Sequence, residues 1–196
     1  MGLTFLRLLL LPVFLWLLLA DAPVDQSAGR PHKYVALAVF AVMAVTDKLD
    51  GYLARRLNQA SKLGALLDPV ADKLLVAASL VLLSFASVAG TDYQIPTYVV
   101  IMVYAKDVLL GVGTLLLLMF RGQVSIHPRL AGKAGTAVQL ALVMATLLAD
   151  DLRRLSPAAV PPLLHTLWWT TAGLAAIAAV DYVFQGVKQL KQPTSS

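Results

Sequence analysis

The sequence predicts an all-α integral membrane protein with six transmembrane helices, in a single domain that covers residues 1–196. Composition is the first observation behind this prediction, because 59% of the residues are hydrophobic and only 14% are charged. The second observation is that the hydrophobic residues form long runs separated by short polar segments. The net charge of +5 suits an anionic membrane surface better than a nucleic acid, so no nucleic-acid partner is expected.

The first predicted span, residues 3–20, allows two interpretations. Arg7, the leucine run and the sequence Ala20-Asp21-Ala22 imitate a cleaved signal peptide. A retained transmembrane helix is the alternative, because cleavage would leave an odd number of spans. The other five spans are predicted at about residues 34–56, 64–88, 96–120, 131–149 and 161–187.

Lysine and arginine residues orient these spans, because cytoplasmic loops are enriched in both. With the N-terminus inside, nine of them lie on the cytoplasmic side and four on the outer side. The short outer loops also contain five aspartates. The sequence therefore predicts a multi-pass protein of the inner or cell membrane with both termini in the cytoplasm.

Four aspartates lie inside the apolar second and third spans, where both approach the cytoplasm. Asp47 and Asp50 are three residues apart, and Asp68 and Asp72 are four apart, so each pair shares one face of a helix. The two helices are joined by a short polar turn, so their acidic faces can meet. Carboxylates in a low-dielectric place repel one another unless cations lie between them. All-oxygen sites favour Mg²⁺ or Mn²⁺, and the pattern predicts such a metal site.

Two other interpretations of these aspartates are weaker. A solvated acidic face is disfavoured by the apolar flanks, since an aspartate at mid-bilayer costs roughly 2.5–3.5 kcal/mol. A cation transporter would spread its carboxylates along a path and contain inverted repeats. In this chain the four aspartates lie within 26 residues. The same stretch includes Arg55, whose planar guanidinium can donate hydrogen bonds to a phosphate. Small residues on the same helices leave room for a ligand beside the metals, namely Gly51, Ala54, Gly64, Ala65 and Ala71.

The spacing of these residues, D-x2-D-G-x2-A-R-x8-G-x3-D-x3-D, resembles the signature of the CDP-alcohol phosphotransferases (CDP-alcohol phosphatidyltransferases), membrane enzymes of phospholipid synthesis. Every signature position is filled. The run LDPVADK resembles the phosphatidylglycerophosphate synthase branch and the related cardiolipin synthases. Thr4 and Arg7 match a T-x2-R pattern in the first helix of the family. The resemblance implies the CDP-alcohol phosphotransferase fold, with a homodimer as one option.

The resemblance also implies a reaction, in which the hydroxyl of an acceptor alcohol attacks the β-phosphorus of CDP-diacylglycerol and CMP leaves. Asp47, Asp50, Asp68 and Asp72 would hold two divalent cations, Mg²⁺ or Mn²⁺. Asp72 would also be the general base that takes the hydroxyl proton. The residues that would contact the cytidine and its phosphates are Gly51, Ala54, Arg55 and Gly64.

The acceptor is expected to be glycerol 3-phosphate, with phosphatidylglycerol, the substrate of cardiolipin synthases, as the alternative. Lys106, Arg129 and Lys133 are the candidate acceptor-binding residues. Lys133 belongs to a G-K-x2-T-x2-Q pattern that resembles this branch, with a positive-inside lysine and polar helix packing as the alternative explanation. Where the family usually has arginine before an acid, this chain has Lys106, which cannot make a bidentate phosphate contact. Asp181, in the last apolar span, has no assigned role.

Overall fold

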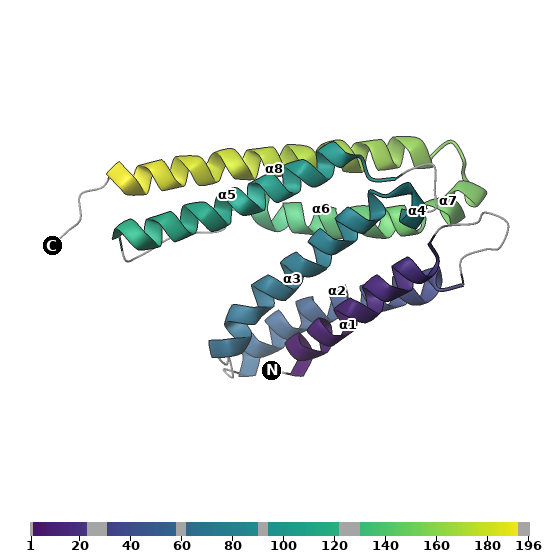
Figure 1. The fold of residues 1–196 in the computed structure, drawn as a ribbon, viewed down its shortest axis with the longest axis horizontal. Helices are drawn as coiled ribbons and strands as arrows, with labels where there is room; N and C mark the ends of the chain where they lie inside the picture. The colour runs from purple at the N-terminus through teal and green to yellow at the C-terminus, as the bar shows by residue number, and fades with distance from the viewer. Residues whose placement is uncertain (1, 23–30, 58–61, 90–93, 122–129, 192–196) are drawn as a thin grey trace. The chain divides into compact units, whose positions relative to one another are not determined.

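In the computed structural model, the described residues are 2–22, 31–57, 62–89, 94–121 and 130–191, and they contain eight helices and no strand. Within these ranges, the side chains of residues 2–5, 47–57, 62–72, 86, 118, 120, 121, 130, 131, 133 and 189–191 are not described. The helices are α1 (Gly2–Ala20), α2 (Lys33–Leu57), α3 (Lys62–Leu83), α4 (Ala86–Ala89), α5 (Thr97–Arg121), α6 (Leu130–Leu147), α7 (Ala149–Leu155) and α8 (Val160–Lys191) (Figure 1). The predicted all-α fold class is therefore confirmed.

Six of the eight helices coincide with the six predicted spans to within a few residues. Among the described residues, two segments are long and apolar enough to cross a membrane, Thr97–Leu117 of α5 and Val160–Lys188 of α8. A third would be Ala134–Leu147 together with α7, a pair bent by 65° at the break between them. The six-span arrangement thus stays a prediction.

Two helices end earlier than the predicted spans, both near the predicted outer surface. The third span was expected to reach about residue 88, but α3 ends at Leu83, whose carbonyl accepts a hydrogen bond of 3.1 Å from the Ile95 backbone N–H. The following residues form the short helix α4. The fifth span was expected to end at residue 149, but α6 ends at Leu147 and α7 begins at Ala149.

The helix α7 occupies a segment that the sequence predicts as an outer loop. Its first turn contains Asp150 and Asp151, and its last turn contains Arg153 and Arg154. This order places negative charge at the positive end of the helix dipole and positive charge at the negative end. A helix of seven residues is too short to be stable by itself, so it depends on contacts with the rest of the chain.

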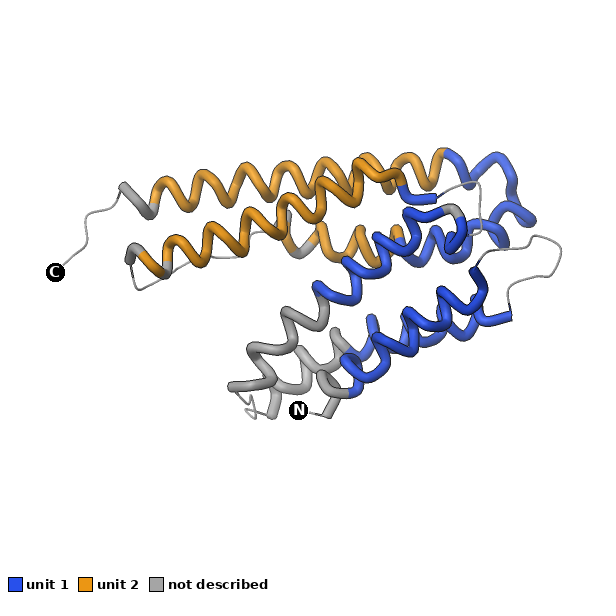
Figure 2. The backbone as a smooth tube through the Cα atoms, in the orientation of Figure 1, with its two compact units in different colours: residues 1–95, 143–161 blue, residues 96–142, 162–196 orange. Residues whose placement is uncertain are grey.

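The chain divides into two compact units (Figure 2). Unit 1 comprises residues 1–95 and 143–161. In this unit α1 packs against both α2 and α3. The rings of Phe14 on α1 and Phe40 on α2 are both fully buried, with centroids 5.4 Å apart. Helix α1 therefore supplies side chains to the core of unit 1.

Unit 2 comprises residues 96–142 and 162–196. Helices α5 and α8 contact each other at Tyr98 and Trp169, whose ring centroids are 5.5 Å apart. The buried side of α8 includes Ala172, Ala175 and Ala178. Small residues of this kind allow close approach between helices in a membrane.

A cluster of charged groups links the start of α2 to α7 within unit 1. The Lys33 ammonium lies 2.8 Å from Asp151 Oδ2 and 3.7 Å from Asp150 Oδ2, and only 4% of the Lys33 side chain is exposed. The Tyr34 hydroxyl donates a hydrogen bond of 2.9 Å to Asp151 Oδ1.

The neighbours of Asp151 lower the pKa of its carboxyl group. Burial alone would raise the pKa of Asp151. The hydrogen bonds from Lys33 and Tyr34 and the charges of Lys33 and Arg154 outweigh burial and hold this pKa below its ordinary value.

We expect Lys33→Met to lower the melting temperature of the detergent-solubilised protein. The substitution preserves most of the side-chain volume but leaves Asp151 without its shortest charge-assisted contact, a loss of about 1.5–3 kcal/mol. For a chain of this size, each kcal/mol corresponds to about 2–4 °C. Lys188→Met, at an exposed position of α8, is the matched control and should change the melting temperature little. Equal effects of the two substitutions would contradict the stabilising role of this cluster.

Candidate active site

The structure places each aspartate pair of the signature on one helix, as predicted. Asp47 and Asp50 lie in α2, and Asp68 and Asp72 lie in α3. Only residues 58–61 separate these helices, so the end of α2 and the start of α3 are neighbours. Of the other signature positions, Gly51, Ala54 and Arg55 lie in α2 and Gly64 lies in α3. Their side chains and those of the four aspartates lie outside the described part, so the meeting of the carboxylates stays a prediction.

The spacing of Asp47 and Asp50 can be compared with that of the buried residues of α2. The buried residues of this helix include Ala36, Phe40 and Met43, at spacings of four and three. The same alternation of four and three, which follows one face of a helix, continues to residues 47 and 50. The sequence spacing therefore favours an inward orientation of the first aspartate pair, which stays a prediction.

The second aspartate pair stands in the same relation to α3. Val76, Ser79 and Leu83 are buried on this helix, and Asp72 is four residues before Val76. Asp68 precedes Asp72 by another four residues. The Ser79 hydroxyl donates to the Leu75 carbonyl at 2.6 Å, so this buried polar group is satisfied within its own helix. The spacing of the second pair thus also continues that of the buried residues of its helix, and the orientation of its carboxylates stays a prediction.

The described side chains offer no competing metal site. Among them, no group of three or more histidine, cysteine, aspartate or glutamate residues lies close enough to hold an ion. The four signature aspartates are not among these side chains, and their carboxylates are the donor type that Mg²⁺ and Mn²⁺ prefer. A carboxylate pair on each of two helices that follow each other in the chain is chemically suited to these cations.

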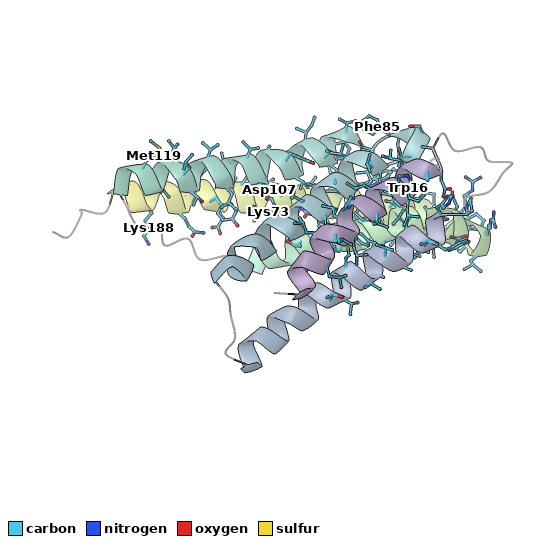
Figure 3. All side chains as sticks on the ribbon, turned by 60° about the horizontal axis from the view of Figure 1, so that its bottom comes forward. Trp16, Lys73, Phe85, Asp107, Met119 and Lys188 are labelled. Atoms are coloured by element: carbon cyan, nitrogen blue, oxygen red, sulfur yellow. The ribbon has the colours of Figure 1, made fainter. Side chains whose placement is uncertain are left out.

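Of the predicted acceptor-binding residues, the structure describes the side chain of Lys106 alone. The Lys106 ammonium lies 3.1 Å from Asp107 Oδ1, and 13% of the Lys106 side chain is exposed. Figure 3 labels Asp107 on α5. Lys106 therefore already has a carboxylate partner that offsets its charge. Lys133 lies in α6, but its side chain is not described, and Arg129 lies outside the described residues.

Tyr182 is not among the predicted site residues, and its hydroxyl lies close to Gly132 of the G-K-x2-T-x2-Q pattern, within unit 2. A Cβ atom added to Gly132 in α6 would lie 3.5 Å from the Tyr182 hydroxyl oxygen, an ordinary van der Waals distance. Asp107 and Asp181 also lie near enough for their charges to act on this hydroxyl. The signal available in the sequence was an aromatic hydroxyl beside an aspartate in an apolar span.

Asp181 has a hydrogen-bond partner within its own helix. The Gln185 side-chain amide, one turn further along α8, donates a hydrogen bond of 3.3 Å to Asp181 Oδ2.

One polar group of the predicted G-K-x2-T-x2-Q pattern is hydrogen-bonded within α6. The Thr136 hydroxyl donates to the Gly132 carbonyl at 3.3 Å. Thr136 is therefore less available to an acceptor than the pattern suggests.

An apolar groove of about 520 Å³ runs between α5 and α8 in unit 2. Its lining includes Leu110, Thr114 and Leu117 from α5 and Tyr182 and Val183 from α8. The Thr114 hydroxyl donates to the Leu110 carbonyl at 2.7 Å. This hydrogen bond satisfies one of the few polar groups in the groove, which therefore suits hydrocarbon rather than a charged ligand.

Comparison with known proteins gives one family match. The sequence profile of the family described as CDP-alcohol phosphatidyltransferase matches residues 1–182.

Individual relatives carry related names. A CDP-diacylglycerol–glycerol-3-phosphate 3-phosphatidyltransferase of Pseudomonas fluorescens is 55% identical over 80 residues, 41% of this chain and 37% of the relative. A probable phosphatidylglycerophosphate synthase of Mycobacterium tuberculosis is 38% identical over 137 residues, 70% of this chain and 59% of the relative. The human cardiolipin synthase (CMP-forming) is 32% identical over 174 residues, 80% of this chain and 54% of the relative. In each case the chain covers less than two thirds of the relative's length.

Proposed function

Because the chain belongs to the CDP-alcohol phosphatidyltransferase family, we propose that it transfers a phosphatidyl group from CDP-diacylglycerol to an alcohol acceptor and releases CMP. The observation that carries this proposal is the position of the four signature aspartates. The two pairs lie on the consecutive helices α2 and α3, at sequence spacings that continue those of the buried residues, and their flanks are apolar. Four carboxylates in such an apolar setting would be tolerated only where cations offset their charge.

The donor set fits a pair of divalent cations held by Asp47, Asp50, Asp68 and Asp72. When bound, Mg²⁺ or Mn²⁺ would neutralise the diphosphate and the charge that develops on the departing CMP. Arg55, on the same helix as the first pair, would bind a phosphate oxygen through its planar fork of N–H donors. Gly51, Ala54 and Gly64 would allow the nucleotide to approach the helix backbones closely.

The chemical step follows from the proposed placement of Asp72. Its carboxylate takes the proton of the acceptor hydroxyl as the oxygen attacks the β-phosphorus. One P–O bond forms to the acceptor, and the P–O bond to the CMP oxygen breaks. The electron pair of the broken bond leaves with CMP, so atoms and charge balance without any further reactant.

We propose glycerol 3-phosphate as the acceptor, which would yield phosphatidylglycerophosphate. Two of the relatives described above carry names for this activity. The basic residues Arg129 and Lys133 would supply cationic donors for a small dianion. Phosphatidylglycerol is the second candidate, favoured by the similarity to human cardiolipin synthase, which extends over 80% of this chain.

The deciding experiment measures CMP release from labelled CDP-diacylglycerol by the purified protein in detergent. Glycerol 3-phosphate and phosphatidylglycerol are supplied in turn, with Mn²⁺ or Mg²⁺ and with EDTA as the control. CMP release that requires both a metal and glycerol 3-phosphate would support the proposal. Metal-dependent synthesis of cardiolipin from phosphatidylglycerol would support the second candidate. Absence of CMP release with every acceptor would contradict both.

We also propose that both termini and the aspartate site face the cytoplasm, because the predicted cytoplasmic loops hold nine of the lysines and arginines against four outside. In the cysteine-free chain, Ser27→Cys should then react with a membrane-impermeant thiol reagent in intact cells. Gln123→Cys should react only after the membrane is opened. Labelling of Gln123→Cys in intact cells would reverse the proposed orientation.

A further inference from the structure

Arg7 is an unusual residue of unit 1, because only 2% of its surface is exposed although α1 is otherwise almost entirely apolar. The arginine side chain keeps its charge at any physiological pH. A buried guanidinium therefore requires an anionic partner within the core. The mechanism proposed above does not use Arg7, so the identity of that anion is a separate question.

The contacts between α1 and α2 define which residues of the two helices lie at the same level. At one end, the His32 backbone N–H and ring Nδ1 contact the Asp21 carboxylate at 3.1 and 2.7 Å. Further along, Phe14 contacts Phe40. Asp21 directly follows α1 and His32 directly precedes α2. Phe14 lies seven residues before Asp21, and Phe40 lies eight residues after His32.

A further step of seven residues along each helix leads from Phe14 to Arg7 and from Phe40 to Asp47. Both helices rise about 1.5 Å per residue, so Arg7 and Asp47 fall at the same level of this antiparallel pair. Arg7 is itself buried, and Asp47 follows the buried Met43 by four residues of the same helix. By this register, Asp47 is the acidic residue of α2 at the level of Arg7.

We infer that Arg7 is a positioning residue whose guanidinium pairs with the Asp47 carboxylate and holds it in the orientation that binds the metal. Two carboxylate oxygens can accept from the planar fork of an arginine, which fixes direction as well as distance. The positive charge of Arg7 would also offset part of the repulsion among the four aspartates. The metal-binding half of this inference rests on the proposed function, whereas the pairing of Arg7 with Asp47 does not.

The pairing is tested by a double-mutant cycle in EDTA, with melting temperature in detergent as the measurement. Arg7→Met should lower the melting temperature by on the order of 10 °C, because it leaves Asp47 as an uncompensated buried charge. In an Asp47→Asn background the same substitution should lower it by a few degrees at most. Equal losses in the two backgrounds would overturn the inference.

A matched control is Phe14→Leu, one heptad along the same face of α1. This substitution removes packing against Phe40 and no charge, so its effect should be the same in the unmodified protein and in the Asp47→Asn background. The Asp50→Asn background tests the register, because the loss caused by Arg7→Met should persist there. Stronger coupling to position 50 than to position 47 would overturn the assignment of Asp47 as the partner.

The consequence for the metal site is measured directly by Mn²⁺ binding, for example from the free Mn²⁺ signal in electron paramagnetic resonance. Arg7→Met should weaken Mn²⁺ binding by about 10- to 100-fold, as loss of a group that orients a metal ligand does. Arg7→Lys, which preserves the charge, should recover part of the affinity, and Phe14→Leu should leave it unchanged. Unchanged Mn²⁺ affinity in Arg7→Met would overturn the positioning role.

Failure of the Arg7→Met variant to fold would itself be informative. The Arg7→Met/Asp47→Asn variant should then be recovered folded, because neither member of the pair is left charged and buried. Failure of the double variant where Asp47→Asn alone folds would overturn the pairing. None of these stability measurements requires enzymatic activity, so they are independent of the proposed reaction.

Discussion

Asp68→Asn should abolish CMP release and weaken Mn²⁺ binding. The amide keeps the size of the side chain, but it brings no negative charge and is a poorer ligand for a hard cation. Loss of one charge-stabilising group in an active site typically lowers kcat by about 10²–10³-fold, and loss of a metal ligand should reach at least that range. The measurement combines initial rates of CMP release with Mn²⁺ titration of the same preparation.

Asp150→Asn is the matched control for this experiment. It makes the same chemical change at an aspartate of α7, whose carboxylate lies 3.7 Å from the Lys33 ammonium. Because this residue lies outside the signature, its substitution should leave the rate and the Mn²⁺ affinity close to those of the unmodified protein. Full activity of Asp68→Asn, or of the unmodified protein in excess EDTA, would contradict the proposed metal site.

The second large effect is expected for Lys133→Ala, which should raise the KM for glycerol 3-phosphate far more than the KM for CDP-diacylglycerol. The acceptor phosphate would lose one charge-assisted contact, worth roughly 1.5–3 kcal/mol. This corresponds to about a 10- to 100-fold loss in kcat/KM for the acceptor. The donor should be little affected, because the residues proposed to bind it lie on α2 and α3 whereas Lys133 lies on α6.

Lys188→Ala provides the control, as it removes a lysine from the exposed side of α8. It should change neither KM. Equal increases in both KM values for Lys133→Ala would mean that the residue supports the fold rather than the acceptor. If phosphatidylglycerol is the acceptor, the effect of Lys133→Ala should be smaller, because that head group carries one negative charge and its acyl chains already hold it in the bilayer.

The sequence alone was sufficient for the fold class, the six long helices and the position of the aspartate pairs on two of them. Long apolar runs leave the backbone few alternatives to a helix in a membrane, because every N–H and C=O group must be satisfied internally. Fixed spacings of three and four residues place side chains on one helix face whatever the surroundings are. For these reasons the prediction for α2 and α3 needed no tertiary information.

Tertiary structure decided the features that depend on contacts between distant residues. Lys33 meets Asp151 across 118 positions of sequence, and α3 ends at Leu83, where the Ile95 backbone N–H bonds to the last carbonyl of the helix. From the sequence, Arg7 is a signal-peptide charge or a topology signal. Its burial and the contact between Phe14 and Phe40 appear only in the tertiary structure, and the inferred pairing with Asp47 rests on them. Apolar periodicity specifies which face of a helix is buried, but the rotation and sliding of two helices against each other arise from side-chain packing at their contact. That packing determines which buried charges can pair.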